Sequence, residues 1–231
     1  MCFRLGHSSK MRKTANFLEI KKTEIASADI PAGYTCPAAN ICKAFAHPVR
    51  RKVIDGRHAE FRCYAASIEA VFPNTMKLHW DNYTALLNTD DDVSKMTDIL
   101  SASIPDKLKV LRIHSFGDFF SANYFEAWTN TARNFPNVTF FNYTKLLPYI
   151  VERDKLPMNF FSTYSVGGVF DHLLPANPQV PYSMVVRTPE EAEEKGLPLA
   201  CSEHPADDIK FVMEGTSFAL LLHGTQPAKK K

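Results

Sequence analysis

The chain has 231 residues, of which 45% are hydrophobic and 23% are charged, and this composition is typical of an ordered globular protein. Its 27 basic and 25 acidic residues leave a formal net charge of only +2, so charge does not indicate a nucleic-acid-binding surface. No stretch approaches the roughly 20 apolar residues of a membrane span, and no apolar run of a signal peptide follows the basic N-terminus. We therefore expect an intracellular, non-membrane protein with a single domain over residues 1–231.

Residues 1–72 are predicted to be a cysteine-bearing loop region that ends in a helix. Residues 1–35 are polar and read as irregular, and they end in turn-forming sequence at residues 30–33. Residues 36–63 indicate either a long ordered loop or a short hairpin, and loops of that length are usually functional. From about residue 60, apolar residues recur at spacings of three and four, which predicts a helix with Cys63 near its start.

Residues 73–198 are predicted to form helices and then βα units, followed by a closing loop and a C-terminal strand in residues 199–231. Two helices follow Pro73 and the acidic triplet at 90–92, and such a triplet suits a helix N-terminus. We expect strands over 110–114, 138–143, 160–164, 182–187 and 218–222, and helices over 121–135, 147–153 and 190–195. This alternation argues for parallel strands with right-handed crossovers.

The expected fold class is α/β, with a partial or open (βα) barrel-like parallel sheet and an N-terminal loop and helical segment. No G-x-G-x-x-G follows any predicted strand, which argues against a dinucleotide-binding Rossmann sheet. The absence of G-x-x-x-x-G-K-[ST] excludes phosphate binding by a P-loop on the same kind of evidence.

Four of the five cysteines make one complete set of metal ligands: Cys36, Cys42, Cys63 and Cys201. In a reducing compartment clustered thiols more often bind metal than form disulfides, and a four-thiolate shell suits both Zn²⁺ and an iron–sulfur cluster. The C-x-x-C pair usual in structural zinc sites is missing, so the wide spacing favours a [4Fe–4S] cluster, with Zn²⁺ as the alternative. A third interpretation is that these are free core cysteines.

A second candidate site lies where three predicted strands end, because active sites of parallel α/β folds gather at the carboxyl ends of strands. Its residues are His114, Ser115, Asp118, Asn142, Lys145 and Tyr164. Polar groups that converge from several strands are what a ligand pocket requires. The alternatives are that Asp118 and Ser121 cap the following helix and that the other polar residues are ordinary loop chemistry.

Several segments together resemble the bacteriophage "gene product 88" domain family, over residues 8 to about 228. They are His7-Ser8-Ser9-Lys10, residues 29–39, Arg62-Cys63-Tyr64-Ala65, Phe72-Pro73-Asn74, Asn82 and residues 112–121. The resemblance implies a phage-encoded protein that works in the host cytoplasm, with recurrent cysteines at the positions of Cys36, Cys42 and Cys63. It implies no reaction, and residues 43–62 look like an insertion relative to many members.

The chain is also distantly similar to radical S-adenosylmethionine enzymes, because a cysteine-bearing loop precedes βα units whose first clear strand ends in Gly117-Asp118. The C-x-x-x-C-x-x-C motif of those enzymes is absent, and a fourth ligand at Cys201 would leave no iron open to the cosubstrate.

Three functional hypotheses follow. The first is a [4Fe–4S] protein in electron transfer or regulation, with a host or phage protein as its redox partner. The others are a structural zinc protein that acts through interaction surfaces and a radical-type enzyme that uses the pocket at the strand ends.

Overall fold

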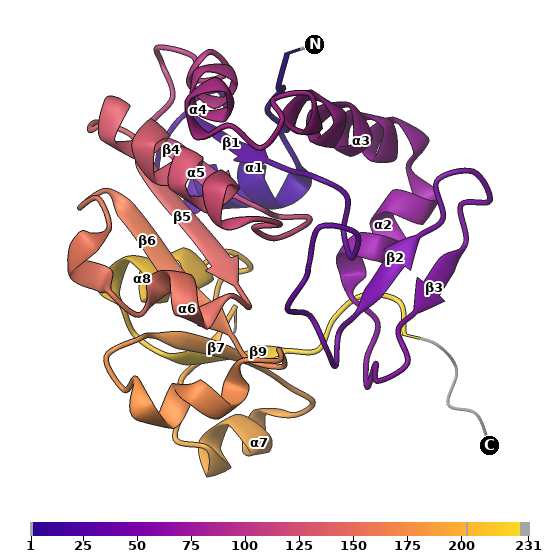
Figure 1. The fold of residues 1–231 in the computed structure, drawn as a ribbon. Helices are drawn as coiled ribbons and strands as arrows, with labels where there is room; N and C mark the ends of the chain where they lie inside the picture. Colours follow the sequence, from indigo (N-terminus) through magenta and orange to yellow (C-terminus); the bar gives the residue numbers. More distant parts are fainter. Residues whose placement is uncertain (1, 202, 227–231) are drawn as a thin grey trace.

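The computed structural model describes residues 2–201 and 203–226, and its centre is a parallel sheet that curves into a half-barrel (Figure 1). Its seven strands follow the order β1-β4-β5-β6-β7-β9-β8. They are β1 Ile25–Ala28, β4 Val110–Ile113, β5 Thr139–Thr144, β6 Phe160–Ser165, β7 Tyr182–Val186, β8 Leu199–Ala200 and β9 Phe218–Leu221. Every neighbouring pair in this order is parallel, which confirms the expected α/β fold with an open, barrel-like sheet.

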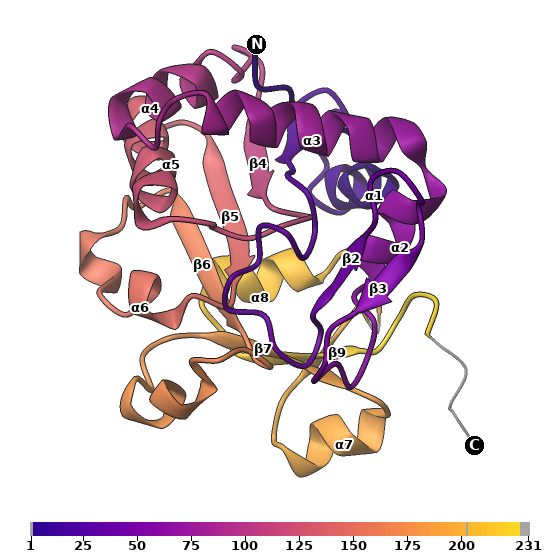
Figure 2. The same ribbon diagram turned by 45° about the vertical axis from the view of Figure 1, so that its right-hand side comes forward.

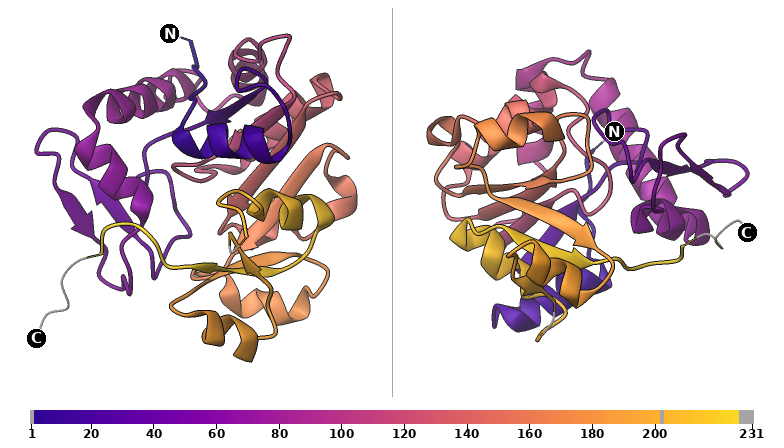
Figure 3. Two further views of the ribbon diagram at one scale, coloured as in Figure 1. Left: turned by 180° about the vertical axis from the view of Figure 1, so that it is seen from behind. Right: turned by 90° about the horizontal axis from the view of Figure 1, so that it is seen from below.

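Helices cover both faces of the sheet, because strand side chains alternate between the faces and both faces are apolar. Leu111 and Phe140 pack toward α4 Val93–Ser101 and α5 Ala122–Asn134, with α3 Pro73–Leu87 beside them (Figure 2). Val110, Phe141 and Phe218 pack on the other face against residues of α1 Ser9–Phe17 and α8 Asp208–Glu214, which lie in front when the molecule is seen from behind (Figure 3).

A hairpin and a short helix stand beside the sheet. Strands β2 Ala44–Ala46 and β3 Val53–Asp55 are antiparallel, so residues 36–63 contain the short hairpin that the sequence left open. Helix α2 Tyr64–Val71 packs on β2, and Cys63 is its N-cap residue, as predicted. The remaining elements are α6 Leu147–Ile150, η1 Arg153–Lys155, η2 Asp171–Ala176 and α7 Pro189–Glu194.

The prediction that residues 1–35 are irregular is wrong, because they form α1 and β1. Helix α1 starts at the Ser8 cap, whose hydroxyl accepts the N–H of Met11, and β1 pairs with β4 over its whole length. The prediction of a closing loop and one strand for residues 199–231 is incomplete, because this segment contains β8 and α8 before β9. Residues 227–231, the end of that segment, lie outside the described residues.

No helix in the described parts of the chain has both the length and the apolar character needed to cross a membrane.

Candidate functional site

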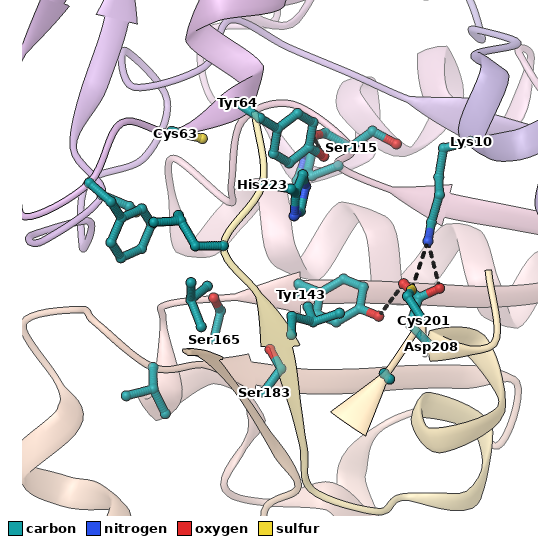
Figure 4. Close-up of a pocket in the computed structure, with 18 of the residues that line it drawn as sticks. Lys10, Cys63, Tyr64, Ser115, Tyr143, Ser165, Ser183, Cys201, Asp208 and His223 are labelled. Atoms are coloured by element: carbon teal, nitrogen blue, oxygen red, sulfur yellow. Dashed lines mark hydrogen bonds and ion pairs between the residues drawn. The ribbon is translucent and has the colours of Figure 1, made fainter. Parts of the chain in front are cut away.

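A cavity of about 680 Å³ opens at the carboxyl ends of the strands, on the face that α1 and α8 cover. Side chains from β5, β7 and β9 form its walls, together with residues that follow β4 and with Lys10 of α1 (Figure 4). All four cysteines of the predicted ligand set line it. Its size is that of a small-molecule site, which usually measures about 300–1,000 Å³.

The loop that carries Cys36 and Cys42 is fixed against the end of β6. The backbone N–H groups of Asn40 and Ile41 both donate to the Gly167 carbonyl, at 3.3 and 3.2 Å. The Lys43 ammonium donates to the Cys36 carbonyl at 2.6 Å. These bonds hold the first two cysteines over the mouth of the half-barrel.

Two of the thiols already receive backbone hydrogen bonds. The Gly33 N–H donates to Cys36 Sγ at 3.3 Å, and Cys63, at the N-terminus of α2, accepts from the N–H groups of Ala65 and Ala66. Backbone donors and a helix N-terminus favour the thiolate form. Burial acts in the opposite direction and dominates, because it raises the pKa of Cys63 to about 11 and that of Cys36 well above its ordinary value.

The structure places Cys36, Cys42 and Cys63 near enough for their charges to interact, and it places Cys201 elsewhere in the cavity. After burial, a Cys42 thiolate is the largest further cause of the raised pKa of Cys63, and both cysteines raise the pKa of Cys36. Cys201 instead has Lys10 at 3.6 Å from its sulfur and receives its charge effects from Asp208, Lys10 and Asp207. Figure 4 shows Cys63 and Cys201 on opposite sides of the cavity.

Among the described residues, no group of three or more His, Cys, Asp or Glu side chains is arranged to hold one metal ion. The four cysteines therefore do not form a single-ion site in this conformation. They divide into a set of three, which we call the cysteine trio (Cys36, Cys42 and Cys63), and the separate Cys201.

Of the six predicted pocket residues, His114, Ser115, Asp118 and Lys145 line the cavity, whereas Asn142 and Tyr164 are not in its wall. The Asn142 amide donates to the Ser162 hydroxyl at 2.9 Å, and the Tyr164 hydroxyl donates to an Asp171 carboxylate at 2.6 Å. Asn142 therefore links β5 to β6, and Tyr164 links β6 to η2.

Asp118 holds two loops together at the cavity edge. Its carboxylate accepts from the Phe119 N–H, the Thr144 hydroxyl and the Lys145 N–H, at 2.7 to 2.9 Å. Burial raises its pKa, while these donors lower it. The capping alternative holds for Ser121, whose hydroxyl accepts the Tyr124 N–H at the start of α5.

Lys145 places a positive charge near the cysteine trio. Its ammonium donates to the carbonyls of Ser165 and Val166, at 2.9 and 2.8 Å, and its charge lowers the pKa of Cys63 against the effect of burial. A buried cation in this position favours thiolates beside it.

The far side of the cavity holds charged residues that sequence reasoning missed. Lys10 of α1 forms a 2.7 Å ion pair with Asp208 of α8, and the Tyr143 hydroxyl donates to the same carboxylate at 3.0 Å. Although burial opposes it, Lys10 and Arg112 hold the pKa of Asp208 below its ordinary value. Of these charged residues, only Arg112 stands out in the sequence, because it is a charged residue in the middle of an otherwise apolar predicted strand.

Fold and site together define a parallel half-barrel α/β protein with a cysteine-lined cavity at its strand ends. Residues 4–230 match the Gene product 88 family, and the chain belongs to it, as the resemblance implied. The comparisons do not show the similarity to radical S-adenosylmethionine enzymes.

Two curated relatives are the Gene 88 proteins of Mycobacterium phages D29 and L5, each 28% identical over 153 residues. Each match covers 60% of this chain and 57% of the relative, so the chain spans little more than half the length of these phage proteins. No solved structure matches the chain.

Proposed function

We propose that this protein is an iron–sulfur enzyme in which the cysteine trio binds a [4Fe–4S] cluster at the mouth of the cavity. The observation that carries the proposal is the division of the cysteines, since the three thiols of the trio interact through their charges and Cys201 has Lys10 as its neighbour instead. Three protein ligands would leave one iron of such a cluster without a protein thiolate. This proposal differs from the four-cysteine electron-transfer protein expected from the sequence in having three protein ligands and an open position.

The residues around the trio fit an iron–sulfur cluster in three respects. Thiolates are its usual ligands, and backbone N–H groups such as those at Cys36 and Cys63 tune its potential by hydrogen bonding to sulfur. Lys145 supplies a positive charge beside the trio. A cluster also separates its ligands more widely than one zinc ion does, which agrees with donors that do not converge on a single point.

The protein's own residues would bind the cluster and balance its charge. When bound, the cluster would supply single electrons at an iron open to a ligand. Lys145 and the N–H groups of Gly33, Ala65 and Ala66 would balance the thiolate charge of the cysteine trio. We place this activity in the host cytoplasm, with a host or phage reductase as the electron donor.

Anaerobic purification followed by iron and sulfide analysis tests the proposal. The wild-type protein should be brown and carry about four irons per chain. Alanine at Cys36, Cys42 or Cys63 should remove most of the iron, whereas Cys201→Ala and the control Cys2→Ala should keep it. Loss of iron in Cys201→Ala would support the four-cysteine site instead. A colourless protein with one zinc would establish the structural zinc alternative.

Reductive cleavage of S-adenosylmethionine by the reduced protein distinguishes a radical enzyme from other open-site iron–sulfur enzymes. A radical enzyme should release 5′-deoxyadenosine, and Cys63→Ala should not.

A further inference from the structure

The side chain of Arg112 is a buried cation that forms no hydrogen bond to any described residue. Its side chain belongs to β4, is only 9% exposed and lines the cavity. The guanidinium lies 5.0 Å from the ring centre of Tyr143 and 5.9 Å from that of Phe141. Its Nε is fully enclosed and has no acceptor. Buried arginines are normally paired, so this fork of donors requires an explanation.

Two neighbours at the end of β4 present further unpaired polar atoms. His114 Nδ1 and Ser115 Oγ are buried without partners, and both residues line the same cavity. His114 Nε2 is 3.1 Å from the Tyr124 hydroxyl, so when that hydroxyl donates, Nδ1 carries the proton and becomes a donor. Burial lowers the pKa of His114 to about 3, which keeps the ring neutral.

The nearby carboxylates are already engaged. Asp208 accepts from Lys10 and Tyr143, and Asp29 accepts from the N–H groups of Ser115 and Phe116 and from the Ser27 hydroxyl. Lys145 is held by carbonyls beside the cysteine trio. Asp208 and Asp29 act on Arg112 only through their charge, which raises the pKa of the guanidinium, and neither carboxylate accepts a hydrogen bond from it.

The acceptor that Arg112 lacks is best matched by a carboxylate. A guanidinium binds a carboxylate through two parallel hydrogen bonds, whereas a phosphate dianion would bring twice the negative charge next to the buried carboxylates Asp208 and Asp29. Among the other residues of the cavity wall, Val185 of β7 and Leu220 of β9 are apolar. The wall thus offers an anion site at Arg112 and an apolar surface at Val185 and Leu220.

We propose that the cavity binds an organic carboxylic acid, with its carboxylate on Arg112 and its apolar body toward Val185 and Leu220. This inference rests on the proposed function in that the acid would lie within reach of the cysteine trio. It names the chemical class of the substrate. Ser115 Oγ and His114 Nδ1 are enclosed within the cavity wall, so the contact with the carboxylate is assigned to Arg112 alone.

Isothermal titration of the full chain with benzoate, benzamide and phenyl phosphate at millimolar concentrations tests this assignment. Benzoate should bind the wild type, and Arg112→Gln should weaken it by about tenfold or more, the usual effect of losing a charged hydrogen bond. Arg112→Lys keeps the charge without the fork and should fall between them. Arg12→Gln is the matched control and should bind benzoate like the wild type, because Arg12 is an exposed arginine of α1 that does not line the cavity.

Several results would overturn the proposal: no binding of benzoate to the wild type, equal binding of benzoate and benzamide, or full binding to Arg112→Gln. Tighter binding of phenyl phosphate would reassign the site to a phosphate. Thermal unfolding shows whether each variant folds, and if Arg112→Gln does not, Arg112→Lys decides.

Iron content is measured on the same samples. A chain without iron that still binds benzoate contradicts only the proposed function, and an iron-loaded chain indifferent to Arg112 contradicts only this inference.

Discussion

Gly33→Ala should destabilise the protein by displacing the loop that presents Cys36. Gly33 has φ +76°, a left-handed conformation that costs an alanine roughly 1–2 kcal/mol. Its added Cβ would also overlap the Ala44 carbonyl oxygen and lie 2.8 Å from the Cβ of Phe45. Such overpacking against backbone adds roughly 1–3 kcal/mol, so we expect a total near 3 kcal/mol.

Gly196→Ala separates the two contributions. Gly196 has a similar φ of +64°, but an added Cβ there meets nothing within 4 Å. That variant should therefore lose only the conformational term, about 1 kcal/mol.

Urea denaturation gives both free energies of unfolding, and iron analysis after anaerobic purification reports on the site. Gly33→Ala should lose about 2 kcal/mol more than Gly196→Ala and should also lose iron, because the Gly33 N–H donates to Cys36 Sγ. Equal destabilisation of the two variants would refute the steric argument. A destabilised Gly33→Ala that keeps all its iron would separate the loop's packing from the metal site.

Two further predictions concern pH and apply to urea denaturation across a pH series. The pKa of His114 is lowered from 6.5 to about 3, so between these pH values the imidazole is protonated in the unfolded chain and neutral in the folded chain. Wild-type stability should therefore fall as the pH drops from about 6.5 toward 3. His114→Asn should flatten this slope, since asparagine tolerates the φ of +68° at this position. An unchanged slope in His114→Asn would contradict the role of His114 in the pH dependence. Asp208 has a lowered pKa and so stabilises the fold above its unfolded pKa. Asp208→Asn should cost about 2 kcal/mol at pH 7 and progressively less below about pH 4, and a pH-independent cost would contradict the ion-pair explanation.

The central strands could be predicted from the sequence because each is a short apolar run bounded by turn residues. β5 and β6 match their expected positions within a residue or two, as a parallel sheet buried on both faces would produce. Helix α4 was equally legible, since the Asp92 side chain accepts the Lys95 N–H as an N-cap.

The elements that were missed have weak local signals. In α1 only Met11, Thr14 and Ala15 are buried, and β1 is a four-residue strand rich in small side chains. Both form because β4 and the concave face of the sheet are there to pack against, which is a tertiary effect. Lys10 lies on α1 and Asp208 on α8, so the charged half of the cavity could not be assembled from the sequence either.

The division of the cysteines follows from the same strand. β1 is parallel to β4 and ends at Ala28, so the chain leaves it at the carboxyl ends of the strands, where His114 and Lys145 also lie. The loop with Cys36 begins there. Cys201, in contrast, follows β8, the last strand at the opposite edge of the sheet. Because the sheet is curved, its two outer strands, β1 and β8, both border one cavity but lie on different sides of it. Without β1 the sequence offered four equivalent thiols; with it, three of them lie over the mouth of the half-barrel, and the space between them and Arg112 is left for a ligand.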